Sequence, residues 1–398
     1  MRCHLVLCRL MALTLLMALT LLLMPAATWA QTVRYEVIPV ISPYNQPGVN
    51  VAHQINKHGG IPFTDLLNGL HAFKWKSGVS IPLALLGGPC SRADGINGLG
   101  HIVGGSCPAG ETSMHAYLYR RGVTHDLGTL GGVAAWGTAV NRYDQIAGDY
   151  ALMDGTSRAF FWQNNNWEDI GSLGGSYISS YGMNNSGTVV GQSDISNTPD
   201  PVYNIPPFHG FVWSAGSLTD LGPIFGSNFN YVFAINDIGT AAGSADLAGD
   251  TGAHTILWKN GAVQDLSPDG NISAGAVSIN NMGQAVGIWG LVDPDPADGP
   301  PAYVTLCPCY AVLWKNGREI FLNGLVPPEW NLMIALAINN KGEIVAEGQL
   351  NGGPLIQTVV LKPVPSKKHL PANGVTRMPF AGPRAIRRDP KRGVVNLW

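Results

Sequence analysis

Histidines recur at one position of a repeated five-residue segment, where metal binding is the first chemistry to consider. The segment reads His71-Ala-Phe-Lys-Trp75 in its first copy, and in two later copies the histidine position holds Arg158 or Tyr310. Arginine and tyrosine there, and spacings that fit no short zinc-ligand pattern, argue against a metal site. We therefore predict a structural strand whose recurring residues are His71, Trp75, His115, Tyr119, Trp162, His209, Trp213, His254, Trp258 and Trp314.

Aspartates recur in a second segment, which reads Asp-Leu-Gly or a close variant. Paired carboxylates catalyse glycoside hydrolysis when they lie roughly 5–10 Å apart, and residues of separate repeats meet that condition only around a shared channel. The sialidase-type Asp box, the Gly-x-Ser-x-Gly elbow, the His-Glu-x-x-His motif and a phosphate loop are absent from the sequence. We therefore predict hydrogen-bonding turn residues at Asp126, Asp169, Asp220 and Asp265.

Four cysteines follow the first 30 residues, and sequence alone does not choose among their three pairings. Cys90 and Cys107 fall in loops that we expect at the same end of one sheet, so a disulfide between them is geometrically sensible. Its loop of about 17 residues would contribute on the order of 3 kcal/mol. Cys307 and Cys309 could bind a soft metal, although a disulfide or free thiols is the more typical use of one Cys-x-Cys.

The elements that must position these residues follow a repeat. Six steps between Ile55 and Ile338 give a period of roughly 47 residues. Each period contains a His-Trp strand, an Asp-Gly strand, an apolar strand that ends in Asn, and a Val-Val-Gly strand. Lys-Asn-Gly and Asn-Asn-x-Gly separate them, and both are turn sequences. Four short strands per period match the size of a propeller blade.

The two ends of the chain complement each other. An Asp-Gly-type strand at 35–40 precedes any His-Trp strand, and the last strand, at 355–364, is a lone His-Trp type. We therefore predict an all-β, seven-bladed β-propeller of four-stranded blades, closed by pairing the first three strands of the chain with the C-terminal strand. The alternative is an open β-solenoid, which would not need complementary ends.

Composition supports this fold class. Glycine supplies 50 of the 398 residues, and 13% of residues are charged against about 25% in average proteins. So few charged helix formers argue against a helical bundle, and an apolar content of 45% argues against a disordered chain. High glycine instead fits many hairpin turns, and low charge fits closely stacked blades.

Residues 1–30 have the features of a secretory signal peptide. Arg2 and Arg9 precede an apolar run at 10–24, and Thr28 and Ala30 mark a cleavage site. The run is shorter than the roughly 20 residues that span a bilayer, so cleavage is favoured over an uncleaved anchor. The propeller is then expected at 31–364, outside the cytoplasm.

Residues 365–398 form a basic tail that we predict to be disordered. They hold eight Lys/Arg and a single acidic residue, Asp389. Attachment to an anionic envelope surface is one hypothesis for this tail, and a passive tail is the other.

The repeated motifs resemble those of the HAF family of extracellular repeat proteins. The resemblance covers roughly residues 35–364 and is strongest at 71–75, 115–132, 158–191 and 254–287. It implies an exported bacterial protein, secreted or periplasmic, and it supplies no catalytic residues.

Loop length gives the main functional indication in the sequence. The connections after the Asp-Gly and Val-Val-Gly strands share one face, vary in length, and are where binding usually resides. Acidic residues there could bind calcium, although the spacing is not that of an EF-hand, and solvated loops are the alternative. The candidate binding residues are Trp136, Tyr177, Tyr181, Asp194, Asp200, Asp293, Asp295 and Asp298.

The sequence thus favours a binding or scaffold module for an extracellular protein or glycan, without a cofactor. A secreted hydrolase or lyase with its site at the channel mouth is the alternative. We expect a monomer with no specific nucleic-acid partner and no transmembrane segment once the signal peptide is removed.

Overall fold

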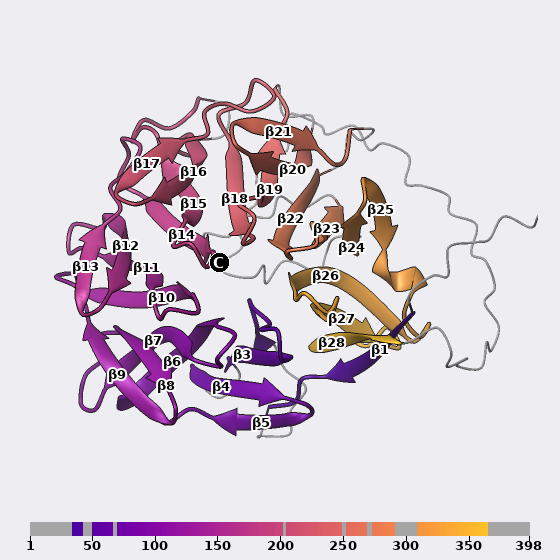
Figure 1. Cartoon of the computed structure of the whole chain (residues 1–398), viewed down its shortest axis with the longest axis horizontal. Coiled ribbons are helices and arrows are strands. Elements are labelled where there is room, and N and C mark those ends of the chain that lie inside the picture. Colours follow the sequence, from indigo (N-terminus) through magenta and orange to yellow (C-terminus); the bar gives the residue numbers. More distant parts are fainter. Residues whose placement is uncertain are drawn as a thin grey trace, which may run out of the picture.

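The computed structural model describes residues 34–42, 50–66, 70–201, 204–248, 252–268, 273–290 and 309–364. Within these ranges the chain forms seven four-stranded antiparallel sheets in a ring (Figure 1). The fold is therefore the predicted seven-bladed β-propeller and not an open solenoid. The expected signal peptide and basic tail lie outside the described residues.

Six blades take their four strands in chain order, from the channel to the rim (Figure 1). In each blade the inner strand is the one that precedes the Asn turn. The six blades are β2 (Asn50–Val51), β3 (Gly60–Asp65), β4 (His71–Lys76) and β5 (Val79–Pro82); β6 (Gly87–Ile96), β7 (Ile102–Pro108), β8 (His115–Arg120) and β9 (Val123–Gly128); β10 (Ala134–Val140), β11 (Ile146–Ala151), β12 (Ser157–Gln163) and β13 (Asn166–Asp169); β14 (Ile178–Met183), β15 (Val189–Asp194), β16 (Phe208–Ser214) and β17 (Ser217–Asp220); β18 (Asn230–Ile235), β19 (Ala241–Asp246), β20 (Ala253–Lys259) and β21 (Ala262–Asp265); and β22 (Ser273–Ile279), β23 (Ala285–Gly290), β24 (Tyr310–Lys315) and β25 (Arg318–Phe321).

The closing blade joins the two ends of the chain. Its order is β26 (Trp330–Ile338), β27 (Ile344–Leu350), β28 (Ile356–Val364) and β1 (Arg34–Pro39), and a 3-10 turn, η2 (Leu322–Gly324), precedes it. The expectation that the first three strands complete this blade is wrong in detail, because β2 and β3 pair with β4 and β5 instead. One N-terminal strand therefore closes a sheet of three C-terminal strands.

Apolar contacts complete the ring at the junction of the closing blade and the first blade. Phe63, Phe73 and Trp75 of the first blade belong to one buried cluster with Leu336 and Val345 of the closing blade. The ring is thus closed by side-chain packing as well as by the backbone ladder between β1 and β28.

The two faces of the ring differ in their connections. The turns between the first and second strands and between the third and fourth strands of each blade are short, and they define what we call the turn face. The connections between the second and third strands and between successive blades define the long-loop face. Antiparallel pairing places these two sets of connections at opposite ends of the strands.

Close backbone contact explains the glycine of the Val-Val-Gly strands. The inner strands carry β-bulges, for example between Gly137 and Ala139. A Cβ atom on Gly148 would lie 2.3 Å from the Trp136 carbonyl oxygen, and one on Gly191 would lie 2.0 Å from that of Ser179. The bulge presses the inner backbone against the second strand, and glycine leaves the room that it needs.

Candidate functional site

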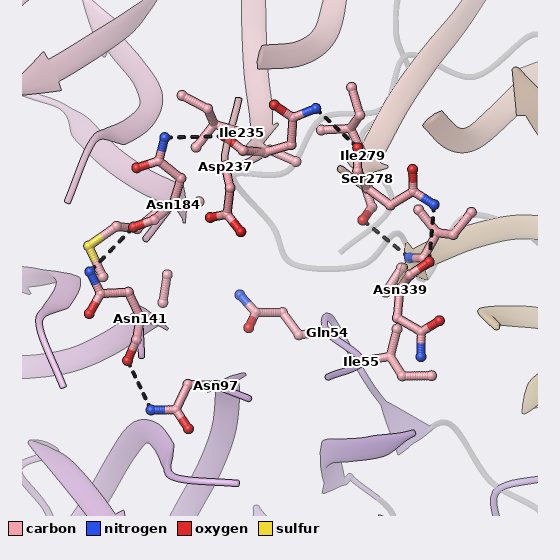
Figure 2. Close-up of a pocket in the computed structure, with 18 of the residues that line it drawn as sticks. Gln54, Ile55, Asn97, Asn141, Asn184, Ile235, Asp237, Ser278, Ile279 and Asn339 are labelled. Carbon is pink, nitrogen blue, oxygen red and sulfur yellow. Dashed lines mark hydrogen bonds between the residues drawn. The ribbon is translucent and has the colours of Figure 1, made fainter. Parts of the chain in front are cut away.

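A closed ring of asparagines surrounds the central channel near the turn face. Each Asn side chain donates from Nδ2 to the backbone carbonyl oxygen of the equivalent Asn in the next blade, over 2.9–3.3 Å. Figure 2 draws part of this ring. The last member, Asn339, donates to Asn56 and so completes the circle. All seven side chains are buried. The ring consists of Asn56, Asn97, Asn141, Asn184, Asn236, Asn280 and Asn339.

The same amides fix the turns in which they lie. Oδ1 of Asn184, for example, accepts the backbone N–H groups of Ser186 and Thr188, both at 3.0 Å. Asparagine favours turns because its side chain can bond to the backbone in this way. One side chain therefore shapes its own turn through the oxygen and joins two blades through the nitrogen.

A polar rim lies one residue beyond the asparagine ring. Asp237 is its most heavily bonded member: Oδ1 accepts the Asn185 backbone N–H, and Oδ2 accepts Nδ2 of Asn185 and of Asn281 at 2.9 and 2.8 Å. Burial opposes ionisation of this group. The hydrogen bonds from Asn281 and Asn185 outweigh burial and lower the pKa of Asp237. The rim residues are Lys57, Gly98, Arg142, Asn185, Asp237, Asn281 and Asn340.

A cavity of about 250 Å³ lies inside the polar rim. Its walls turn apolar one residue before each ring Asn, as at Ile235 and Ile279. Tyr181 and Phe233 also line it, with their ring centroids 5.5 Å apart. The cavity therefore offers amide and charged groups at its mouth and an apolar wall below.

Exposed apolar side chains surround the mouth two residues beyond the ring. Leu99 is 64% exposed, Tyr143 58%, Ile238 55% and Met282 58%. These four residues, which we call the apolar collar, occupy the same turn position in four different blades. Exposed apolar side chains at one repeated site form a surface suited to contact with another molecule.

A shallower pocket of about 520 Å³ adjoins the collar at Tyr143. The Arg142 guanidinium carbon lies 4.5 Å from the centroid of the Tyr143 ring. Gln145, Asn185 and Asp237 add hydrogen-bonding groups to the same pocket. This pocket therefore combines an aromatic face with polar groups.

Basic residues are concentrated on the turn face. All 14 Lys/Arg between the predicted signal peptide and tail are described, and 12 lie in a turn of this face or within two residues of a strand end there. Seven acidic residues meet the same criterion: Glu36, Asp94, Asp144, Glu168, Asp237, Glu319 and Glu343. The 12 basic residues are Arg34, Lys57, Lys74, Lys76, Arg120, Arg121, Arg142, Lys259, Lys315, Arg318, Lys341 and Lys362.

An ion pair lies deeper, on the inner strand β6. Nε and Nη2 of Arg92 donate to the Asp94 carboxylate at 2.7–3.0 Å, and the Arg92 guanidinium lies 5.7 Å from the Trp136 ring centroid. Burial lowers the pKa of neighbouring His53, and Asp94 offsets part of that effect. Arg92, Asp94 and Trp136 already bond to or stack on one another, so they stabilise the inner strands.

The predicted binding residues do not form one surface. Trp136 and Tyr181 belong to the inner strands β10 and β14, and the prediction that they lie in loops is wrong because these strands begin earlier than the motif indicates. Tyr177 is half-buried just before β14. Burial raises the pKa of Asp194 to about 6, and Asp200 lies in the following loop. The remaining three, Asp293, Asp295 and Asp298, lie outside the described residues.

The recurring histidines and aspartates meet at the rim of the blades, near the long-loop face. Nδ1 of His209 lies 2.8 Å from Asp220, and Nδ1 of His254 lies 2.7 Å from Asp265. His115 and Asp126 form the same bridge at 3.0 Å. In the blade that carries Arg158, Tyr150 Oη donates to Asp169 instead. Each aspartate also accepts an N–H two residues ahead, as Asp220 does from Gly222.

Recurring aromatic residues vary in burial. Trp75, Trp213 and Trp314 are buried, whereas Tyr119, Trp162 and Trp258 are partly buried. In the described ranges no group of three His, Cys, Asp or Glu side chains is placed to hold a metal ion.

A disulfide joins Cys90 and Cys107 on β6 and β7. The predicted pairing of these two residues is confirmed. Cys309 is buried just before β24, and its predicted partner Cys307 lies outside the described residues.

Sequence reasoning missed the apolar collar. Its signal is present, since Leu, Tyr, Ile or Met stands between the Asn and the following turn residues in four copies. A single apolar residue in a turn does not indicate a site by itself. The four copies form a surface only because the fold places them around one opening.

Comparison with known proteins supports the fold alone. No protein-family model and no curated protein matches the chain. One solved structure that resembles it is the β-propeller domain of the Trilobed protease from Pyrococcus furiosus, which is described as having an open velcro topology. The two chains are 8% identical, with a TM-score of 0.51, and the match covers 80% of this chain and 99% of that chain. YCF48 bound to D1 peptide is 10% identical with a TM-score of 0.46, and the match covers 85% of this chain and 100% of that chain. A gluconolactonase from Xanthomonas campestris is 9% identical with a TM-score of 0.38, and the match covers 84% of this chain and 93% of that chain.

Proposed function

We propose that this protein is an exported, HAF-type binding module that contacts an extracellular protein, glycan or other envelope component through its turn face. Export is supported by the signal peptide predicted at residues 1–30 and by the Cys90–Cys107 disulfide, since disulfides persist in oxidising compartments. The apolar collar around the channel mouth is the observation that carries the proposal.

The turn face is favoured over the long-loop face because it is both exposed and preorganised. Oδ1 of Asn280 accepts the Met282 backbone N–H, and Oδ1 of Asn141 accepts that of Tyr143. The exposed side chains therefore stand on turns that are already fixed, so binding orders little backbone. Two of the long-loop candidates, Trp136 and Tyr181, lie on inner strands instead.

Binding is also favoured over carboxylate-catalysed hydrolysis at this mouth. Asp237 is the one carboxylate among the described residues that line the 250 Å³ cavity. Its oxygens accept three hydrogen bonds, and its lowered pKa keeps it ionised. A glycosidase needs a protonated carboxyl group as its general acid near neutral pH, and the lowered pKa of Asp237 opposes that role.

Oxidative footprinting tests which face binds. The purified protein is exposed to hydroxyl radicals with and without an envelope fraction of a Gram-negative bacterium, which contains membrane, peptidoglycan and surface polysaccharide. We expect protection of Met282 and Tyr143, while Met153, which is 91% exposed on the long-loop face, stays reactive as the internal control. Protection of Met153 alone would assign binding to the long-loop face, and no protection at all would contradict the binding role.

A further inference from the structure

The two faces of the ring differ in charge as well as in loop length. The turn face holds 12 basic and seven acidic residues, whereas the rest of the described chain holds two basic and 13 acidic residues. The turn face therefore carries a net positive charge.

The basic residues spread around the ring rather than gathering on one side. Six of the seven blades contribute at least one, and the blade of β14–β17 contributes none. The apolar collar stands inside this basic perimeter. Lys76 and Arg121, for example, lie at the end of an outer strand and in an outer turn, whereas Leu99 and Tyr143 lie in inner turns.

We propose, on the basis of the proposed function, that the turn face docks on an anionic lipid bilayer as a peripheral surface. The four collar side chains would enter the boundary between headgroups and acyl chains, and the surrounding Lys/Arg would face the lipid phosphates. Amphipathic surfaces bind membranes by this combination of apolar insertion and attraction to anionic lipid.

The shape of the collar favours a bilayer over an acidic peptide. The four apolar side chains stand singly in four blades and surround an opening, so they do not form a continuous groove for an extended chain. A planar lipid surface can meet all four at once, together with charges around the whole perimeter. The described chain also leaves the ring at Val364, opposite Arg34 on this face, ahead of the segment that holds eight Lys/Arg.

The test is co-sedimentation of the full chain with vesicles. We expect binding to vesicles of 30 mol% phosphatidylglycerol in phosphatidylcholine and at least tenfold weaker binding to pure phosphatidylcholine. A charge variant, Lys76→Gln with Arg121→Gln, Lys259→Gln and Lys315→Gln, should reduce affinity at least tenfold, because each basic residue near an anionic surface adds to the attraction. The matched control is Arg158→Gln, which removes a charge near the long-loop face and should change nothing.

A collar variant separates lipid from other anions. Leu99→Ser with Tyr143→Ser, Ile238→Ser and Met282→Ser should weaken vesicle binding at least tenfold and leave binding to dissolved polyglutamate unchanged, with Met153→Ser as its control. Vesicle binding by wild type must also protect Met282 from oxidation, which keeps the test valid if the variant folds poorly.

Two outcomes would overturn the lipid proposal. One is the absence of binding to phosphatidylglycerol vesicles, and the other is equal binding to polyglutamate and vesicles without an effect of the collar variant. Protection of Met282 by the envelope fraction, together with no vesicle binding, would leave the proposed function intact and reject the lipid as its ligand.

Discussion

Two buried carboxylates occupy the same repeat position and meet different environments. Asp149 and Glu347 each lie eight residues after a ring asparagine, on β11 and β27. Asp149 accepts hydrogen bonds from Ser179 Oγ at 2.6 Å and from the N–H and Oγ of Ser180 at 2.8 Å. Glu347 faces the first blade, on the same side of β27 as Val345, and its Oε1 has no hydrogen-bond partner.

The pKa values reflect this difference. Burial raises the pKa of Asp149 to about 6 even though the two serines oppose the shift. Burial alone raises the pKa of Glu347 from 4.5 to about 7. Because its folded-state pKa is raised, Glu347 favours the folded state below pH 4.5, and this contribution is lost as the pH rises from 4.5 to 7.

We predict that Glu347→Gln stabilises the protein at alkaline pH. Near pH 4.5 the variant and wild type should have similar free energies of unfolding, and at pH 8 the variant should be more stable by about 3 kcal/mol. Urea unfolding at both pH values measures the difference. Asp149→Asn is the contrast, since an amide cannot accept all three hydrogen bonds and should destabilise at both pH values. A Glu347→Gln effect that is the same at pH 4.5 and pH 8 would contradict this account.

At the scale of the strand, one glycine in each of five blades lies against the bulge of the neighbouring inner strand. Two blades are exceptions: Phe63 holds the equivalent position on β3, and Ala346 takes the place of glycine on β27, where the register shifts on both sides of its partner Ala335. The Val-Val-Gly motif is therefore a consequence of backbone packing and not of turn formation.

Gly191→Ala should destabilise the protein by at least about 2 kcal/mol, because its Cβ would lie 2.0 Å from the Ser179 carbonyl oxygen and the backbone must move. Thermal unfolding followed by circular dichroism measures the change. Ala346→Gly is the matched control and should cost about 1 kcal/mol or less. A Gly191→Ala variant as stable as wild type would show that the inner strand yields easily at its bulge.

Strand types could be predicted from sequence because each carries its own side-chain signature. His209 and Asp220 mark neighbouring strands that bridge to each other, and Asn184 marks a turn that its own amide builds. The boundaries of a blade could not be predicted in the same way. The repeat in the sequence gives the number of residues per blade but not where a sheet begins. That boundary depends on strand pairing, because β28 pairs with β1 and β2 belongs to the next sheet.

The candidate site escaped prediction for a related reason. Loop length indicates the long-loop face and predicts a loop at Tyr181, although this residue lies on β14. Leu99 and Met282 are 183 positions apart in the sequence, and only closure of the ring places them around one opening. Local patterns do not contain that information.

At the scale of the whole molecule, β1 closes the ring by completing the last sheet. Its six residues pair with β28, and Tyr35 is buried in the core of the closing blade. A variant that lacks residues 1–39 should lose several kcal/mol of stability and aggregate, because the edge of β28 becomes exposed. Its melting temperature and light scattering check this, and an added peptide of residues 34–40 should restore both. An unchanged melting temperature would mean that blade packing alone holds the ring.

The asparagine ring has a consequence for how such proteins change in evolution. Every blade supplies one amide donor and one carbonyl acceptor to its neighbours, so each hydrogen bond depends on having a next blade and not on having seven of them. Duplication or loss of one repeat would leave no amide without a partner. The asparagine ring therefore does not set the number of blades. That number is set instead by the volume of the side chains packed between the blades.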